Sequence, residues 1–309
     1  MSPSQTLTRP DRAASADHAT RPGDRRRTRS ASPLLGRGVV NGVLIAAMLW
    51  TVLPLTWLVV AATKGYADLY STGGFEFARV RLWENLVALF TFNDGLFLRW
   101  LLNSFLYAGV GALVSSMISI LAGYAFDKFR FPGKERWFGL VLLGVLVPAA
   151  VTTVPLYLMA SDLGLTNSFW GVFLPGLASP FGVYLGRVFS QAYVPDELLE
   201  ATRVDGAGEL RTFWQIAFPL LRPAFATLFL FGFTGGWNAF FMPLLMLSDH
   251  ELYPVGLGLF MWRQLINTDQ DLYYPLLMTG SLVAILPLIV AFFSLQRYWK
   301  AGLTAGAVK

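Results

Sequence analysis

Six long apolar stretches, almost free of charge, are the feature that most restricts how this 309-residue chain can fold. Five contain no charged residue, and the sixth holds only Arg187, near one end. A helix of about 20 apolar residues crosses the roughly 30 Å of hydrocarbon in a bilayer. Inside lipid each segment must satisfy its own backbone groups, which favours helix over isolated strand. We therefore predict six membrane-spanning helices: 39–63, 104–126, 137–161, 168–190, 223–248 and 276–296.

The low charge content supports the same conclusion. Only 14% of the residues are charged, whereas soluble domains have about 25%. A chain with so few charged residues cannot cover itself with a water-compatible surface, so most of its exterior must face the lipid bilayer. The predicted fold class is an all-α membrane protein with six transmembrane helices.

The basic residues predict the orientation of these helices. Of the 24 Lys and Arg residues, 19 fall in the N-terminal tail, in 127–136, in 187–222 and in 297–309. The other loops hold the remaining five. Because cytoplasmic loops are enriched in Lys and Arg, both termini are predicted to be cytoplasmic.

The net charge of +5 belongs to one tail. Residues 1–38 contain eight Arg and three Asp, so residues 39–309 are neutral overall. The tail is rich in Ser, Thr, Pro and Ala and has no apolar periodicity, so we predict a disordered basic cytoplasmic tail over 1–38 and a six-span domain over 39–309. This distribution argues against a nucleic-acid partner.

The residue types needed for several kinds of chemistry are missing. The chain has no Cys, and its two His residues, His18 and His250, have no second ligand at metal spacing. Gly133-Lys134 lacks the first Gly and the hydroxyl residue of a phosphate-binding loop. We therefore predict no catalytic residue, no metal site and no cofactor bound by this chain.

The fourth loop, about 190–222, has the pattern of ordered structure. Pro195 suits the start of a helix, Asp196 and Glu197 suit its positive end, and Gly206 suits its stop. A second helical pattern with spacing i, i+3, i+4, i+7 starts at Leu210. The sequence predicts two short cytoplasmic helices over about 195–217.

The charge of this loop indicates what it contacts. Amphipathic helices on membrane surfaces carry Lys and Arg toward anionic lipid. Residues 194–210 hold five acids and one base, Arg203, which anionic lipid would repel. This favours a protein partner over the alternative of a membrane-surface helix.

At this loop the chain resembles the binding-protein-dependent permeases of ABC importers. Glu200-Ala201, Gly206, Ile216 and Pro219 stand at the spacing of the EAA motif of that family. Thr202 and Phe218 depart from the motif, which has Ala and Leu there.

Other stretches are similar to the carbohydrate-uptake branch, and within it to the G-type permease subunit of the maltose importer. The likeness covers about 39–309. The stretches are Phe129-Arg130-Phe131-Pro132-Gly133, Val154-Pro155-Leu156-Tyr157, Trp237-Asn238, Pro243-Leu244, Gln296-Arg297-Tyr298 and the ending Gly302–Lys309.

This resemblance implies a type I ABC importer permease in a bacterial inner membrane that translocates a sugar or oligosaccharide. The implied partners are a second six-span permease, two copies of a cytoplasmic ATPase that binds ATP and Mg, and an external solute-binding protein. The resemblance implies that a coupling helix transmits closure of the ATPase to the pore. The implied ATPase-coupling residues are Glu200, Ala201, Thr202, Asp205, Gly206 and Ala207.

Two further sets of residues are candidates. The resemblance implies that the C-terminal tail reaches the ATPase through Gly302, Leu303, Thr304 and Gly306, whereas its composition also fits simple fraying. Polar or aromatic residues within or beside the spans are candidates for a solute path, although such residues also serve in helix packing. The path candidates are Asn103, Ser116, Thr153, Trp237 and Asn238.

Two alternatives remain open. One is an ABC permease for a solute other than a sugar. The other is a secondary transporter, which commonly carries ionisable residues inside its spans. The predicted spans have no central charge, which counts against the second alternative.

Overall fold

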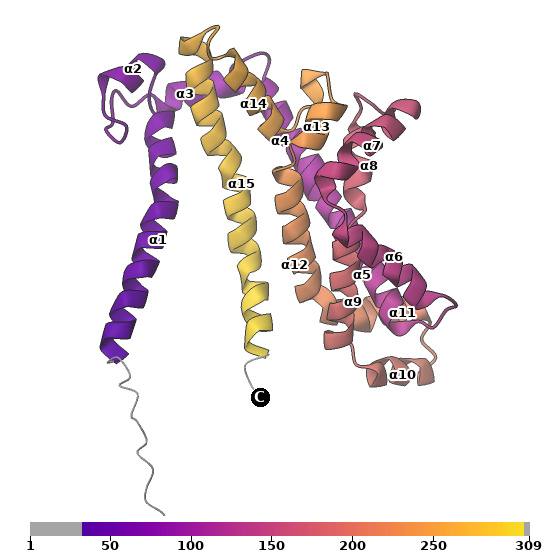
Figure 1. Ribbon diagram of the computed structural model, residues 1–309. Helices are drawn as coiled ribbons and strands as arrows, with labels where there is room; N and C mark the ends of the chain where they lie inside the picture. The colour runs from indigo at the N-terminus through magenta and orange to yellow at the C-terminus, as the bar shows by residue number, and fades with distance from the viewer. Residues whose placement is uncertain (1–32, 306–309) are drawn as a thin grey trace, which may run out of the picture. The chain divides into compact units, whose positions relative to one another are not determined.

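The computed structural model describes the backbone of residues 33–305 and the side chains of residues 37–148 and 150–296. All regular elements in this part of the chain are helices (Figure 1), as the predicted all-α class requires. Residues 1–52 and 53–309 form two units, and each is considered by itself. Residues 1–32 of the predicted tail lie outside the described residues. Residues 33–38, which were predicted to belong to the tail, form the start of helix α1 (Pro33–Ala62).

Five helical segments are long and apolar enough to cross a bilayer. They are Arg37–Ala62, Leu96–Lys128, Phe169–Tyr193, Glu209–Trp237 and Gln270–Gln296. The last is part of α15 (Gln270–Ala305). These segments agree with five of the six predicted spans in place along the chain, although several are longer than predicted.

The remaining predicted span, 137–161, is not one straight helix. It consists of α6 (Lys134–Leu146) and α7 (Ala149–Asp162), which meet at an angle of 106°. Val147 and Pro148 both have extended backbone between the two helices. Proline disfavours helical backbone in the residue before it, which explains the break.

Three crossings are assembled from several elements. The first is α4 (Leu96–Ser104), η1 (Phe105–Val110) and α5 (Gly111–Lys128), the second is α8 (Phe169–Leu177) and α9 (Pro180–Tyr193), and the third is α11 (Glu209–Thr212), η2 (Phe213–Ala217) and α12 (Phe218–Trp237). Elements η1 and η2 are π-helical turns, which insert an extra residue into a helix.

The third crossing corrects two predicted boundaries. The second cytoplasmic helix is not separate from the fifth span, because η2 joins α11 to α12 without a break and takes up the distortion that Pro219 causes. The span predicted over 223–248 ends at Trp237, and a separate short helix, α13 (Phe241–Met246), follows. The apolar residues after Trp237 pack in a core instead of extending the helix.

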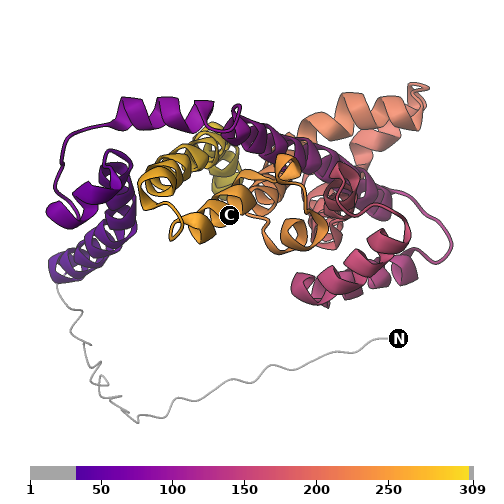
Figure 2. The ribbon, with the colours of Figure 1, turned by 90° about the horizontal axis from the view of Figure 1, so that it is seen from above.

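Short helices occupy the two ends of the 53–309 unit. Helix α10 (Asp196–Val204) lies at one end, and α13 and α14 (Val255–Leu265) lie at the other (Figure 1). The other short helices are α2 (Tyr66–Ser71), α3 (Leu82–Thr91) and η3 (His250–Leu252). Seen from above, α14 runs beside α15 (Figure 2), with which it is packed.

Two buried clusters stabilise this unit. One, near α14, is rich in aromatic residues, and the rings of Trp100 and Trp262 lie 4.6 Å apart between centroids. The other lies beneath α10 and includes Tyr124, Leu199 and Phe213. Between the clusters, α5 and α9 touch through glycines, as small residues allow in membranes.

Candidate coupling helix, translocation path and outer face

Helix α10 is formed by the signals that the sequence contains. Pro195 caps its start with extended backbone, and Asp196 and Glu197 occupy the first turn, where negative charge complements the helix dipole. The helix ends before Gly206, whose φ of +75° is in the left-handed region. The predicted stop at Gly206 is confirmed.

One side of α10 is anchored to the rest of the chain. Leu199 is 3% exposed and belongs to the buried cluster with Phe213. Thr202 Oγ1 donates to Leu199 O at 2.8 Å and lies 3.2 Å from Thr212 Oγ1. Thr202 therefore fixes α10 to the start of the next crossing.

The other side of α10 is open. The predicted coupling residues Glu200, Ala201, Asp205 and Gly206 are exposed, and Ala207 is half-buried. The structure therefore gathers the six predicted coupling residues on one short helix and its turn, with Thr202 facing inward. Their coupling role stays a prediction.

Exposed apolar side chains surround these residues. They are Leu198 (44% exposed), Val204 (88%), Leu210 (76%) and Trp214 (49%). The second helical pattern, which starts at Leu210, is helical in the structure as α11 and η2, and it leaves Leu210 and Trp214 exposed. Contiguous exposed apolar residues rimmed by polar ones are typical of surfaces that bind another protein.

A charge network links α10 to two membrane-spanning helices. Lys128, at the end of α5, bonds to Asp196 at 2.7 Å and to Asp127 at 3.0 Å. Ser190, near the end of α9, donates from Oγ to Asp127 Oδ2 at 2.7 Å. The Lys128 ammonium lowers the pKa of Asp196, so this carboxyl is held in its charged form.

A second ion pair spans the turn at Gly206. Arg203 Nε donates to Glu209 Oε1 at 3.0 Å. This bond raises the pKa of the already basic Arg203 guanidinium. Because both side chains are about half exposed, the pair is a modest brace across the turn.

The candidates for a solute path do not form one group. Trp237 is 4% exposed and its indole N–H donates to Ala284 O at 3.1 Å, so this side chain packs between helices. Asn238 Nδ2 donates to Thr234 O. Ser116 and Thr153 are both buried. A path role for these residues stays a prediction.

The side chain of Asn103 belongs to a group that we call the carbonyl clamp, which consists of Trp100, Asn103 and Tyr107. These residues, on one face of α4 and η1, donate to backbone carbonyl groups of the loop before α14. The bonds are Trp100 Nε1 to His250 O (2.7 Å), Asn103 Nδ2 to Glu251 O (2.7 Å) and Tyr253 O (3.0 Å), and Tyr107 Oη to Leu252 O (3.2 Å). The amide of Asn103 is therefore committed to holding this loop.

The C-terminal candidates are only partly described. Gly302, Leu303 and Thr304 have helical backbone, because α15 continues to Ala305. Gly306 lies outside the described residues. The proposed contact of this tail with an ATPase stays a prediction.

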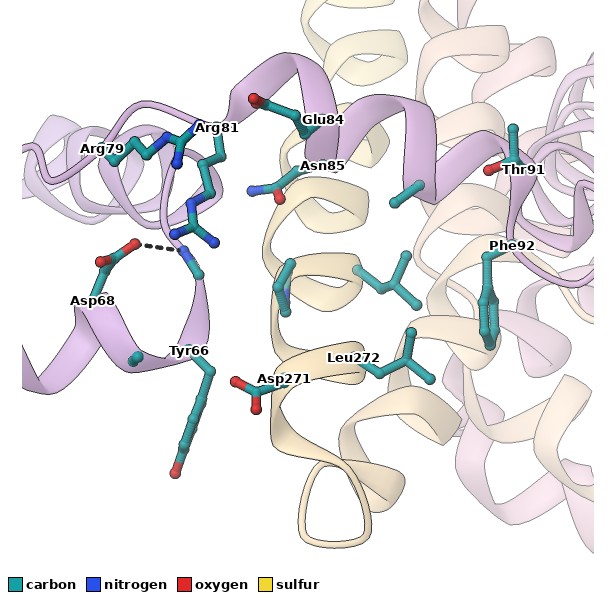
Figure 3. Close-up of a pocket in the computed structure, with 15 residues that line it drawn as sticks. Tyr66, Asp68, Arg79, Arg81, Glu84, Asn85, Thr91, Phe92, Asp271 and Leu272 are labelled. Carbon is teal, nitrogen blue, oxygen red and sulfur yellow. Dashed lines mark hydrogen bonds between the residues drawn. The ribbon is translucent and has the colours of Figure 1, made fainter.

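The end of the 53–309 unit that carries α14 holds a cavity that sequence reasoning missed. It has a volume of about 690 Å³ and opens between α2, α3 and the start of α15 (Figure 3). Its walls carry both signs of charge, from Asp68, Arg79, Arg81, Glu84 and Asp271. Asp271 comes from α15, nearly 190 positions after the other four residues, so no local pattern could have predicted that it meets them.

Comparisons with known proteins agree with this geometry. Residues 115–304, more than half of the chain, match the model of the family described as "Binding-protein-dependent transport system inner membrane component". A solved chain from a bacterial ABC transporter involved in the import of the acidic polysaccharide alginate has the same fold. It matches with a TM-score of 0.74 and 22% identity over 87% of this chain and 98% of that one.

Several curated relatives match over nearly their full length. The arabinooligosaccharides transport system permease protein AraQ of Halalkalibacterium halodurans is 31% identical over 91% of this chain and 99% of its own. The lactose transport system permease protein LacG of Rhizobium radiobacter is 31% identical over 88% and 96%. The sn-glycerol-3-phosphate transport system permease protein UgpE of Yersinia pestis is 32% identical over 84% and 93%. The chain belongs to the family of inner-membrane components of binding-protein-dependent transport systems.

Proposed function

We propose that this chain is the membrane-spanning permease subunit of an ATP-driven importer for a sugar or oligosaccharide. The relatives named for arabinooligosaccharides and lactose support a carbohydrate. The relative named for sn-glycerol-3-phosphate keeps a non-sugar solute as the alternative. Membership of a binding-protein-dependent family sets aside the secondary transporter.

The proposed assembly contains permease, ATPase and solute-binding subunits. A second six-span permease completes the pore, two copies of a cytoplasmic ATPase bind ATP and Mg, and an external binding protein delivers the solute. The family description supports an inner-membrane location. The distribution of Lys and Arg supports cytoplasmic termini.

The observation that carries the proposal is the two-sided character of α10. The side that faces the rest of the chain is fixed by Leu199 and Lys128. The opposite side presents Glu200, Ala201 and Val204, which have no partner in the described part of the chain. A rigidly held helix with an open apolar and acidic face is suited to dock into a groove of another protein. Force applied to it passes through Lys128 to α5, and through the bond between Asp127 and Ser190 to α9.

The test is a pair of matched valine variants. We expect Val204→Asp to abolish co-purification of the ATPase, because it places a charge in the centre of the docking face. Val80→Asp serves as the control, since Val80 is also exposed (59%) but lies near the start of α3. Equal ATPase recovery from both variants would contradict the assignment of α10 as the docking helix.

Glu200→Ala gives a second measure of the same contact. Glu200 is exposed, so its loss should leave the fold intact while removing a charge that a basic group on the ATPase can meet. A hydrogen bond to a charged group is worth about 1.5–3 kcal/mol. We expect reduced hydrolysis of ATP in response to the loaded binding protein, measured in reconstituted vesicles. Unchanged stimulation would show that Glu200 is a solvated charge.

A further inference from the structure

A cavity within the membrane-spanning part of the chain is lined by serine hydroxyl groups. It lies between α5, the α8–α9 junction and α12, and has a volume of about 180 Å³. Ser116 is 12 residues before Lys128, so about 18 Å of helix separates it from the cytoplasmic end of α5. The cavity therefore lies at the depth of the hydrocarbon.

Three buried hydroxyls face this cavity without a partner. Ser115, Ser116 and Ser119 are 7%, 3% and 2% exposed. In the described part of the chain, no hydrogen bond of their Oγ atoms to another residue is found, although helical serines often bond to the preceding turn. These Oγ atoms are also not sealed off, unlike Tyr124 Oη and Tyr274 Oη. Open, unpaired hydroxyls at the cavity wall need polar groups to bind.

The broken helix beside the cavity is an independent observation. The crossing Phe169–Tyr193 is interrupted at Ala178 and Ser179, near its middle. Non-helical backbone at membrane depth is tolerated where it is buried in protein or lines a water-filled space. Ser179 lines this cavity, and its Oγ accepts from Gly182 N at 3.0 Å. The break thus supplies further polar groups at the same place.

The remaining lining residues define the kind of solute that fits. Besides the four serines, the walls are formed by Phe181, Phe231, a leucine and two glycines, and none of the lining residues is charged. Phe181 and Phe231 are about half exposed and contribute aromatic carbon to the wall. An ionised group placed here would lose its hydration without a counter-ion. Hydroxyls beside aromatic faces match a neutral polyhydroxylated molecule.

We propose that this serine cavity is a solute subsite of the translocation path, selective for neutral polyhydroxylated solutes over anions. The proposal rests on the proposed function and narrows it, since it favours a neutral saccharide over a phosphorylated polyol. It also gives Ser116 a specific partner, the hydroxyl groups of the passing solute.

Because the chain has no native Cys, single cysteines give a direct test in the assembled importer in vesicles. The probes are a neutral hydroxyethyl methanethiosulfonate and an anionic sulfonatoethyl methanethiosulfonate. Rates at Ser116→Cys are normalised to those at Ala67→Cys, an exposed position in α2. We expect the neutral reagent to react at least about tenfold faster at Ser116→Cys after this correction. Ala112→Cys, on the same helix but packed in the core, should react with neither.

Three results would overturn the proposal. Equal rates for both reagents would show that the cavity does not discriminate between neutral and anionic molecules. Reaction of Ser116→Cys only with lipophilic N-phenylmaleimide would show that lipid fills the cavity, and reaction with no reagent would show that another subunit fills it. Ser115→Cys repeats the measurement at a second position, in case Ser116→Cys does not assemble. ATP-driven uptake by the unsubstituted importer is measured in parallel, so failure of the proposed function is seen separately from failure of the subsite.

Discussion

Lys128 Nζ lies 2.7 Å from Asp196 Oδ1, so the last residue of α5 is bonded to the first residue of α10. The two residues are 68 positions apart in the chain. Only 8% of the Lys128 side chain is exposed, whereas 76% of the Asp196 side chain is. The bond therefore connects a buried part of the transmembrane region to an exposed helix.

Removal of this bond should loosen α10 without unfolding the chain. We expect Lys128→Met to weaken the attachment of α10 by only about 0.2–1 kcal/mol, because Asp196 is largely exposed. The ratio of solute imported to ATP hydrolysed should nevertheless fall, since the helix moves less rigidly with α5. Asp196→Asn removes only the partner on α10 and keeps the Lys128–Asp127 pair, so it should lower the ratio to a similar extent. If Asp196→Asn leaves the ratio unchanged, Lys128 acts through Asp127 instead.

The same bond predicts how the attachment depends on pH. Lys128 lowers the pKa of Asp196 in the folded protein relative to its unfolded value of about 3.9. A lowered carboxyl pKa gives stability that is present above the unfolded pKa and is lost as the pH falls through the folded pKa. The protection factors of amides in α10, which are corrected for the intrinsic pH dependence of hydrogen exchange, should therefore be constant from pH 8 to pH 5 and fall only below about pH 4. In Asp196→Asn this acid-dependent step should be missing; its persistence there would assign it to another group.

Two glycines near the end of α10 form a matched pair for a backbone test. Gly206 has φ +75°, whereas Gly208 has φ −72°, and a side-chain carbon at either would meet nothing within 4 Å. Gly206→Ala should cost about 1–2 kcal/mol through backbone conformation alone, and Gly208→Ala should cost almost nothing. Protease resistance of the 195–217 segment in detergent measures the difference. Equal sensitivity of the two variants would show that the turn at Gly206 can relax into another conformation.

Cysteine labelling tests the proposed orientation in the membrane. Ala67→Cys in α2 and Ala192→Cys in α9 replace exposed alanines at the two ends of the 53–309 unit. An impermeant thiol reagent should label position 67 in intact spheroplasts and position 192 only after lysis. Labelling of position 192 from outside would reverse the assignment made from the basic residues.

Much of the architecture follows from local sequence. Apolar stretches free of charge identify the crossings, and Pro195, Asp196 and Gly206 identify α10, because each acts within one turn of its own position. The angle of 106° between α6 and α7 is different. Pro148 indicates a break there, but the angle is determined by packing against helices that no local pattern specifies.

Part of the candidate site could likewise be predicted from local sequence, and part of it could not. The spacing of the EAA motif identified Glu200 and Gly206, because all positions of that motif lie in one continuous segment of the chain. The exposure of Leu198 and Val204 and the bond from Lys128 to Asp196 depend on how distant segments fold together. The serine cavity is also a product of three crossings, so Ser116 could be named from sequence, whereas its meeting with Ser179 and Phe231 of the other two crossings could not.

The carbonyl clamp has a consequence for how this chain can change over time. Trp100, Asn103 and Tyr107 donate to carbonyl oxygens of the segment 250–253, which every amino acid provides. Leu252 and Tyr253 also pack in the buried cluster, whereas the side chains of His250 and Glu251 are exposed and take part in surface ion pairs. Substitutions can therefore accumulate at positions 250 and 251, and alter what this face of the protein recognises, while the segment keeps its path and the helices around it stay undisturbed.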